Sequence, residues 1–228
     1  MSPTLIITDL DGTLLRTDKT ISEYTKNVLQ QCRASGIKIA YATGRANPHL
    51  VINDKLFNAQ ISCNGAVVRV NGNIIHSKLI HADVARPLLA ACVKRSMNIV
   101  SEYNGKHYEN SVTYNTPAEK IYTWTQSSQD IEFLEQNLPD DTHMLVARDG
   151  MAMIMHREAT KAKAVAALAA FWDIAQANIM AFGDDLNDID ILKYAGTGVA
   201  MENALGEVKD AADYIYADQM TTTASQIL

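Results

Sequence analysis

Short apolar runs alternate with helix-like segments along most of this chain of 228 residues, and this alternation restricts the fold more than any other feature. The first run, Leu5–Thr8, is β-branched and has apolar residues at successive positions, which is typical of a strand covered on both faces. A helix is expected over 22–35, because Ser22 is a suitable N-cap and Gly36 a suitable stop. Alternating strands and helices form a mainly parallel sheet through right-handed crossovers. The pattern therefore predicts an α/β fold, a Rossmann-like, mainly parallel sheet with helices on both faces.

The same pattern extends towards both ends of the chain. "AQISCNGAVV" is interpreted as one strand, and Asn71-Gly72 between two apolar runs predicts a hairpin. Further strands are expected at 37–42, 178–182, 196–201 and 213–217, and further helices at 48–56, 161–172, within "GDDLNDIDIL" and at 205–212. We assign all of these segments to one domain.

The middle of the chain follows a different pattern from about residue 82. Helices are expected over 83–97 and 129–137, each followed by a strand pair, over 99–109 and 143–156, whereas 110–128 has no clear period. Two α-β-β units in succession are unlike the alternation around them. We therefore predict one core domain from 1–81 and 158–228, with 82–157 forming an inserted, smaller α+β domain.

Composition excludes several classes of partner. A formal charge of −6 and a pI near 5.5 disfavour nucleic acid, which selects a basic surface. No segment reaches the ~18 apolar residues of a membrane span, and the first residues do not resemble a signal peptide. The three widely spaced cysteines contain no CxxC pair and fit reduced thiols. We expect a cytoplasmic protein with no nucleic-acid and no membrane partner.

Three of the expected strands end in polar residues. These endings are Asp9 with Asp11, then Thr43-Gly44-Arg45, and then Gly183-Asp184-Asp185. In open parallel sheets the functional site lies beyond the carboxyl ends of the strands. The three endings together therefore predict a site that combines carboxylates, a hydroxyl and an arginine.

Carboxylates from separate strands favour a hard divalent cation, and ligation by oxygen alone indicates Mg²⁺. Asp184 and Asp188 are four residues apart and would face the same way if a helix began at Asp184. The alternative interpretation of this segment is an acidic helix start stabilised by the helix dipole.

The paired carboxylates Asp9 and Asp11 fit phosphoryl transfer. One of them is suited to act as a nucleophile that forms an aspartyl-phosphate, and the other, held protonated, as a general acid. Gly12 lets backbone N–H groups approach a phosphate, and the hydroxyl of Thr43 can donate to its oxygens. Lys161, at an expected helix start, is suited to neutralise the transferring group.

These motifs, in this order, resemble those of the haloacid dehalogenase superfamily. The matching segments are "DLDGTL" (9–14), "TGR" (43–45), "TKAKAVAAL" (160–168) and "GDDLNDIDIL" (183–192). "CNGA" (63–66) and "GVAMENA" (198–204) further resemble the Cof-type phosphatases with a type IIB cap. In such proteins the cap is inserted between the second and third motifs, which is where 82–157 lies in this chain. The resemblance implies that 82–157 is a cap that sets substrate specificity.

The resemblance also implies a role for each matching residue. Asp9 would be the nucleophile and a Mg²⁺ ligand, and Asp11 the general acid and base, which ligates Mg²⁺ through its carbonyl. Asp184 and Asp188 would complete the metal site. The phosphate would be held by the remaining matching residues: Gly12, Thr43, Gly44, Arg45, Lys161 and Asn187.

The expected protein is a Mg²⁺-dependent phosphatase, monomeric or homodimeric, acting on a small phosphate ester such as a sugar phosphate or phosphoglycolate. A phosphomutase or phosphotransferase is the nearest alternative, and a non-catalytic phosphometabolite-binding module a more distant one. Two positions depart from the family pattern, since Ala162 follows the lysine and Glu202 stands where glycine is usual. Lys163, two residues beyond Lys161, is a second candidate for the catalytic lysine. The sequence does not identify the metabolite.

Overall fold

The computed structural model describes residues 3–48, 52, 54–112, 115–147 and 149–216. The chain divides into two compact units, one formed by 1–76 with 160–228 and the other by 77–159. The range 82–157, predicted as an insertion, lies inside the second unit. Each unit has its own sheet and its own apolar core.

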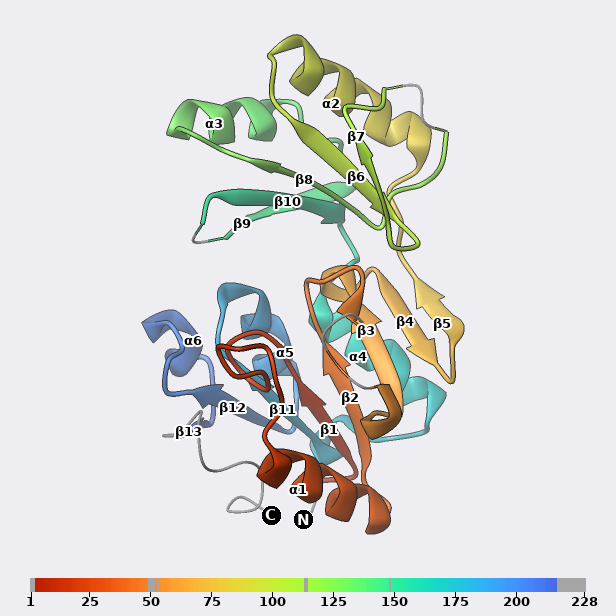
Figure 1. The fold of residues 1–228 in the computed structure, drawn as a ribbon, viewed down its shortest axis with the longest axis vertical. Coiled ribbons are helices and arrows are strands. Elements are labelled where there is room, and N and C mark those ends of the chain that lie inside the picture. Colours follow the sequence, from red (N-terminus) through yellow and green to blue (C-terminus); the bar gives the residue numbers. More distant parts are fainter. Residues whose placement is uncertain (1–2, 49–51, 53, 113–114, 148, 217–228) are drawn as a thin grey trace. The chain divides into compact units, whose positions relative to one another are not determined.

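The first unit is built on an eight-stranded sheet of order β13-β12-β11-β1-β2-β3-β4-β5 (Figure 1). The strands are β1 (Leu5–Thr8), β2 (Lys38–Ala42), β3 (Ala59–Ser62), β4 (Val67–Val70), β5 (Asn73–Ser77), β11 (Ile179–Gly183), β12 (Thr197–Met201) and β13 (Tyr214–Tyr216). The pairs from β13 to β3 are parallel, and β4 runs antiparallel to β3. The predicted α/β fold is confirmed.

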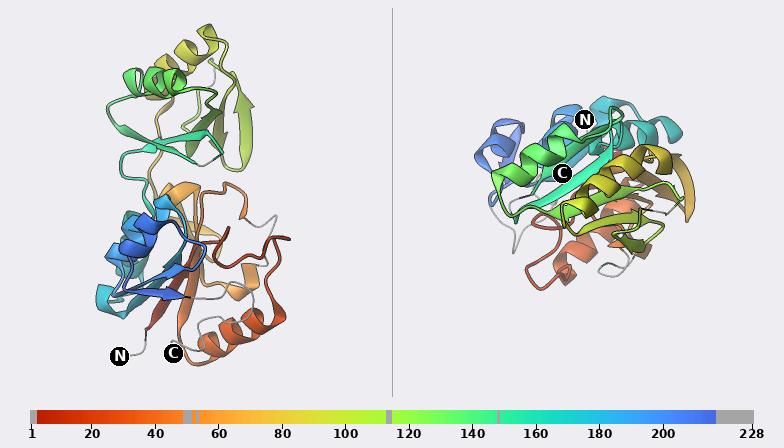
Figure 2. Two further views of the ribbon diagram at one scale, coloured as in Figure 1. Left: turned by 90° about the vertical axis from the view of Figure 1, so that its left-hand side faces the viewer. Right: turned by 90° about the horizontal axis from the view of Figure 1, so that it is seen from above.

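Helices cover both faces of this sheet (Figures 1 and 2). They are α1 (Glu23–Ala34), α4 (Lys161–Phe171), α5 (Ile189–Tyr194) and α6 (Gly206–Asp210). Ile6 packs in the same cluster as Val28 of α1, whereas its neighbours Leu5 and Ile7 pack with α4 and α5. Because successive strand residues point to opposite faces, a strand covered on both sides is apolar at every position.

The register of the central strands sets the position of the polar residues that follow them. Thr8 of β1 is level with Tyr41 of β2 and with Phe182 of β11. The three strands therefore end together, so the residues that come next meet at one edge of the sheet.

The segment "AQISCNGAVV" is not the single strand that its apolar residues suggest. The chain reverses after β3 through a 3-10 turn at Cys63–Gly65 and returns as β4. Cys63, Asn64 and Gly65 all have positive φ, at 49°, 54° and 103°, which a strand cannot contain. Of the helix expected over 48–56, the structure shows a 3-10 turn at Asp54–Leu56, and the positions 49–51 and 53 lie outside the described residues.

The second unit has a five-stranded antiparallel sheet of order β7-β6-β8-β10-β9. Its elements are α2 (Ala82–Lys94), β6 (Ile99–Tyr103), β7 (Lys106–Glu109), β8 (Lys120–Trp124), α3 (Ser128–Gln136), β9 (Thr142–Val146) and β10 (Met151–His156). Both helices lie on one side of the sheet (Figure 1), where Leu88 and Leu134 pack against Ile121 and Ile154. The middle strand β8 falls within 110–128, a stretch in which the sequence shows no clear period.

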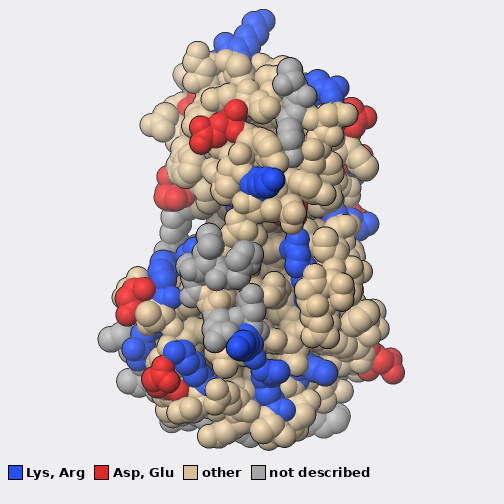
Figure 3. All heavy atoms as spheres, turned by 45° about the vertical axis from the view of Figure 1, so that its right-hand side comes forward, with Lys and Arg blue, Asp and Glu red and all other residues tan. Residues whose placement is uncertain are grey.

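Helix hydropathy, the cysteines and the surface charge do not narrow the class of protein further. The described residues include no helix long and apolar enough to cross a membrane. All three cysteines are buried free thiols. In the view of Figure 3, lysine and arginine side chains gather over the first unit, with fewer acidic side chains between them.

A glycine at the turn after β3 gives a test of this fold. A Cβ on Gly65 would lie 2.2 Å from the carbonyl oxygen of Thr160, at the start of α4. Because the backbone is also left-handed there, Gly65→Ala should lower the free energy of unfolding by roughly 2–5 kcal/mol. Gly72→Ala is the matched control, since φ is +79° and no atom lies within 4 Å. It should cost only about 1–2 kcal/mol in urea unfolding, and equal losses would contradict the close packing of this turn on α4.

Candidate active site at the carboxyl edge of the central strands

Residues that follow β1, β2 and β11 converge at one edge of the sheet. Asp9 follows β1 and its backbone N–H donates to Phe182 at 2.9 Å. Thr43 follows β2, and Asp184 follows β11. The structure thus brings together the three polar strand ends that the sequence pointed to.

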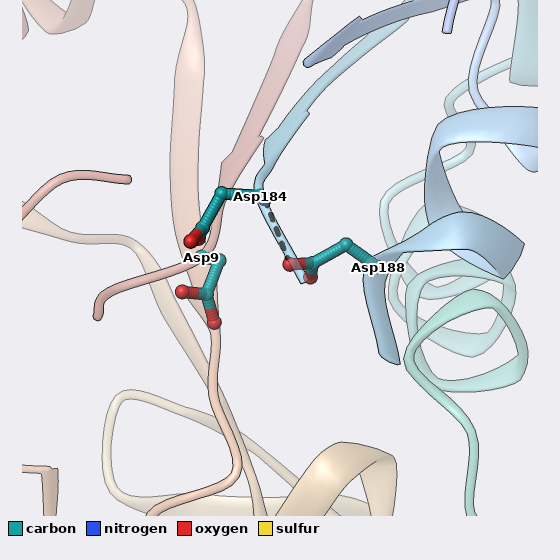
Figure 4. A group of neighbouring side chains, drawn as sticks. All are labelled: Asp9, Asp184 and Asp188. Carbon is teal, nitrogen blue, oxygen red and sulfur yellow. Dashed lines mark hydrogen bonds between the residues drawn. The ribbon is translucent and has the colours of Figure 1, made fainter. Parts of the chain in front are cut away.

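Asp9, Asp184 and Asp188 form a cluster of buried carboxylates (Figure 4). One carboxylate oxygen of each residue lies within 4.8 Å of the others. The side chains are almost fully enclosed, with relative exposures of 7%, 9% and 1%. Like charges held this close need a cation or a proton between them.

Asp188 reaches the cluster from a 3-10 turn, so the condition under which helical spacing would align it with Asp184, a helix that begins at Asp184, is not met. The turn spans Leu186–Asp188 and α5 begins only at Ile189. The Oδ2 atom of Asp188 accepts hydrogen bonds from the backbone N–H groups of Asp184, at 3.1 Å, and Asp185, at 3.2 Å. A Cβ on Gly183 would lie 2.4 Å from the Cβ of Asp188, so the strand has to end in glycine for the turn to close.

Lys161 bridges two of the carboxylates. Its Nζ lies 2.6 Å from Oδ1 of Asp9 and 2.6 Å from Oδ1 of Asp188, and the side chain is 1% exposed. It is the first residue of α4, and the preceding Thr160 caps the helix by accepting from the N–H of Lys163. The side chain of Lys163 is exposed, so the structure places Lys161 in the cluster.

The cluster carries more negative than positive charge. Burial raises the pKa of Asp9 to about 8 although Lys161 opposes the shift, and the charges of Asp188 and Asp184 raise it further. Burial also raises the pKa of Asp184 to about 6 against the hydrogen bond from Thr13. Burial alone would lower the pKa of Lys161, but Asp188 and Asp9 hold it above its ordinary value. One ammonium does not balance three carboxylates, and an all-oxygen cluster of this kind fits a hard divalent cation.

Asp11 lies outside this cluster and is paired with two cations. Arg45 donates to it twice, from Nε to Oδ2 at 2.6 Å and from a terminal nitrogen to Oδ1 at 2.7 Å, and Lys19 donates to Oδ1 at 2.7 Å. Partial burial would raise the pKa of Asp11, but Arg45 and Lys19 outweigh it and hold the pKa below its ordinary value. The expectation that Asp11 is held protonated is therefore wrong for this state, because two cations stabilise its ionised form.

The expected phosphate-binding residues lie around this edge. Gly12 has φ +89°, and a Cβ there would lie 2.2 Å from Oδ2 of Asp184. Thr43 is 1% exposed and its hydroxyl accepts from the N–H of Arg45 at 3.2 Å. A Cβ on Gly44 would lie 3.1 Å from Oδ1 of Asn64. Asn187 donates to that same oxygen of Asn64 at 2.9 Å, which places it beside the turn that follows β2.

Several polar contacts of the site involve residues to which we had assigned no role. The hydroxyl of Thr13 donates to Oδ1 of Asp184 at 2.8 Å. Asn203 donates to Oδ2 of Asp184 at 3.2 Å and to the carbonyl of Gly12 at 3.0 Å. Thr13, Asn203 and Asn64 all lie inside segments quoted for the family resemblance, so that signal was present in the sequence.

The departures from the family pattern leave these contacts intact. The N–H of Ala162 donates to Oδ2 of Asp190 at 3.1 Å, so the second residue of α4 is fixed through its backbone. Glu202 is exposed to solvent beside Asn203.

Fold and site together define a class of protein, an α/β enzyme-like core with a lysine-bridged acidic cluster at the carboxyl ends of its central strands. The family model for haloacid dehalogenase-like hydrolases matches residues 6–126 and 98–226. The chain belongs to this family, and the resemblance seen in its motifs is confirmed.

The relatives are named as phosphatases. The chain is 28% identical over 225 residues to the 5-amino-6-(5-phospho-D-ribitylamino)uracil phosphatase YcsE of Bacillus subtilis, with 92% of this chain and 88% of the relative covered. It is 24% identical over 233 residues to the HMP-PP phosphatase of Cronobacter sakazakii, with 88% and 84% covered.

Solved structures share the fold. BT1666 of Bacteroides thetaiotaomicron superimposes with a TM-score of 0.82 at 24% identity, over 94% of this chain and 89% of that one. The subclass IIB sugar phosphatase BT4131 gives a TM-score of 0.79 at 23% identity, over 93% and 92%. The architecture is thus shared although most residues differ.

The raised pKa values predict how pH and metal affect stability. In metal-free protein, Asp9 and Asp184 bind a proton more tightly when folded, since their pKa values rise from 3.8 to about 8 and about 6. These two groups contribute their full stabilisation at pH values below their pKa in the unfolded chain. The stabilisation is lost as the pH rises through their pKa values in the folded protein. Mg²⁺ binds the ionised groups, so it should raise Tm more at about pH 8 than at about pH 5.

Scanning calorimetry with and without Mg²⁺ at each pH measures this difference in Tm. Groups elsewhere titrate equally in both samples, so their effect on Tm cancels in the comparison. Asp184→Asn should remove most of the pH dependence of the Mg²⁺ effect. A Tm increase as large at low pH as at high pH would argue against a metal site in this cluster.

Removing the bridging ammonium gives a second test. Lys161→Met leaves Asp9 and Asp188 without their shared cation and should cost roughly 3–5 kcal/mol of unfolding free energy. Mg²⁺ should recover part of this loss, because it supplies positive charge to the same carboxylates. Lys163→Met, on the exposed face of the same helix turn, should change stability by less than about 0.5 kcal/mol. Similar losses for both variants in urea unfolding would contradict the bridge.

Proposed function

We propose that this protein is a Mg²⁺-dependent phosphatase that hydrolyses a small phosphorylated metabolite through an aspartyl-phosphate on Asp9. The observation that carries the proposal is the bridge from Lys161 to Asp9 and Asp188, beside Asp184, at the carboxyl edge of the sheet. Membership of the haloacid dehalogenase-like family and relatives named as phosphatases support the same reaction class.

Asp9 is the proposed nucleophile. Lys161 fixes its Oδ1 atom and restrains the carboxylate at the end of a buried strand, which keeps the attacking group in one orientation. In the first step a carboxylate oxygen of Asp9 forms a bond to phosphorus, and the bond from phosphorus to the ester oxygen breaks. The departing oxygen takes a proton from the carboxyl group of Asp11.

In the second step a water molecule attacks the phosphorus of the aspartyl-phosphate. The bond between phosphorus and Asp9 breaks, and the proton of the water passes to Asp11. The pairing with Arg45 and Lys19 stabilises the ionised form of Asp11, which is the form that accepts this proton. Inorganic phosphate leaves, and Asp11 carries the proton that the next leaving group requires.

The metal site fits the residues present. The carboxylates of Asp9, Asp184 and Asp188 would hold Mg²⁺ together with the backbone carbonyl of Asp11, and the 4.8 Å spread of the carboxylate oxygens suits a shared cation. When bound, Mg²⁺ neutralises the charge on the oxygens of the transferring phosphoryl group.

The phosphate itself would be held by groups around the strand ends. Backbone N–H groups at Gly12 and Gly44, the Thr43 hydroxyl, and the side chains of Asn187 and Arg45 are candidates, with Lys161 neutralising the transferring group. Small residues at 12 and 44 are needed for close packing against Asp184 and Asn64, and they also let backbone donors approach an anion.

We propose that the inserted segment 82–157 determines which metabolite is hydrolysed. The face of its sheet that carries no helix presents Tyr122 and the half-exposed Trp124, whose rings meet edge to face at 5.3 Å. Aromatic rings of this kind suit the organic part of a metabolite. The names of the two relatives, both of which act on phosphorylated small molecules, are consistent with substrates of this size.

A phosphomutase would need basic residues in the insertion for the second phosphate of a sugar bisphosphate. Two basic side chains there are already paired with acids, Lys120 with Glu102 at 3.0 Å and Arg95 with Asp130 at 3.3 Å. These pairs favour the phosphatase over the mutase.

Replacing the nucleophile tests the proposal. Asp9→Asn should lower Mg²⁺-dependent hydrolysis of p-nitrophenyl phosphate by roughly 10³-fold or more, because the amide cannot form the intermediate. Asp173→Asn, the same change at an exposed position after α4, should leave the rate unchanged. Phosphate release by Asp9→Asn near the wild-type rate would mean that another group attacks. Transfer of label from a sugar bisphosphate to a monophosphate, without free phosphate, would instead establish the mutase.

A further inference from the structure

Lys19 contacts Asp11 from a loop that folds back on itself. Its Nζ donates to Oδ1 of Asp11 at 2.7 Å, eight residues earlier in the chain. The lysine side chain is half exposed and the carboxylate is 35% exposed. The contact was not expected from the sequence, because neither the strand pattern nor the family motifs include Lys19.

The loop is held in a defined conformation. The N–H of Lys19 donates to the carbonyl of Arg16 at 2.9 Å, and the N–H of Arg16 donates to the carbonyl of Thr20 at 2.9 Å. Asp18 accepts from the N–H of Thr20 at 3.0 Å and from its hydroxyl at 2.6 Å. These bonds close a tight turn, so the lysine backbone is fixed next to Asp11.

The backbone at Lys19 is left-handed, with φ at 64°. Glycine or asparagine is the usual residue in this region, because other side chains are strained there. A lysine at such a position carries backbone strain. Strained residues of this kind are found preferentially at functional sites, where the position of the side chain matters.

The three hydrogen bonds to Asp11 are distributed unequally between its two oxygens. Oδ1 accepts from Arg45 and from Lys19, whereas Oδ2 accepts from Nε of Arg45. Each carboxylate oxygen has two acceptor sites. Lys19 thus fills the second acceptor site of Oδ1. Among the contacts of the described residues, Oδ2 is the oxygen that can still accept a hydrogen bond.

We propose that Lys19 is a positioning residue that, together with Arg45, orients the Asp11 carboxylate so that Oδ2 takes the proton of the attacking water. The inference rests on the proposed function. In the step concerned, the water oxygen bonds to phosphorus, the bond from phosphorus to Asp9 breaks, and the water proton moves to Oδ2 of Asp11. Lys19 acts through Asp11 and does not touch the phosphoryl group.

An exposed ion pair without a role in the reaction is the competing account, and such pairs contribute little. The two accounts differ in kinetics. Breakdown of the aspartyl-phosphate depends on Asp11 as a base, whereas its formation from p-nitrophenyl phosphate does not need a strong acid, because nitrophenolate is a good leaving group. Loss of Lys19 should therefore slow breakdown and leave formation unchanged.

The experiment compares Lys19→Met, Lys19→Gly and Lys19→Arg with wild-type protein, using p-nitrophenyl phosphate and saturating Mg²⁺. We expect kcat to fall about tenfold in the Met and Gly variants. KM should fall in parallel, so that kcat/KM stays within about twofold. The fraction of protein trapped as phosphoenzyme by acid quench should rise, and Lys19→Arg should restore most of the rate.

Lys19→Gly also separates positioning from folding, because glycine relieves the strain of the left-handed backbone. Urea unfolding should show this variant to be at least as stable as Lys19→Met. Lys26→Met is the matched control, since Lys26 forms an exposed ion pair with Glu23 at 2.6 Å on α1. Its kinetics should equal those of the wild type.

Unchanged kcat in the Met and Gly variants would overturn the inference and leave an exposed ion pair. An equal fall in kcat and kcat/KM, with no added phosphoenzyme, would also overturn it, because Lys19 would then act before the intermediate. If Asp9→Asn retains activity near the wild-type rate, the proposed function itself fails, and this outcome is independent of Lys19.

Discussion

The bridge that Lys161 makes between Asp9 and Asp188 is the interaction on which the rest of the site depends. It joins the end of β1, the first turn of α4 and the 3-10 turn after β11, three segments far apart in the chain. Without a buried cation, the three carboxylates would repel one another and strongly disfavour the folded state. With one ammonium, the cluster is held together but keeps an excess of negative charge. The same arrangement therefore stabilises the fold and, through its excess of negative charge, favours the binding of a further cation.

The parts of the site that follow from sheet geometry were predictable from the sequence. Unbroken apolar runs indicated parallel strands, and parallel strands bring their following residues to one edge, which placed Asp9, Thr43 and Asp184 together. Helical spacing does not explain the position of Asp188, because a 3-10 turn and not a helix carries that residue. Asp11 was expected to be protonated, and the two cations beside it show why spacing alone does not determine a charge state.

The parts that were missed depend on long-range neighbours or on local backbone conformations that the pattern of residue types does not encode. Strand β8 places the polar residues Lys120 and Thr123 at buried positions beside Ile121, so its apolar signal is weak although it lies in the middle of its sheet. Asn64 has a left-handed backbone within an apolar segment that otherwise indicates a strand. Asn203 meets Gly12 across most of the length of the chain. The motifs contain Asn64 and Asn203, but the partners that these residues contact become visible only when the fold is known.

The chain leaves the first unit after His76 and returns at Thr160, whose hydroxyl caps the helix that begins with Lys161. The polar contacts described around Asp9, Asp11 and Asp184 are all made within the first unit. The inserted segment can therefore diverge in sequence and length while the phosphoryl chemistry stays fixed, provided that the chain re-enters at a residue able to cap α4. If the insertion determines selectivity as proposed, selectivity and reactivity can evolve separately, and the first turn of α4 is the junction that selection must preserve.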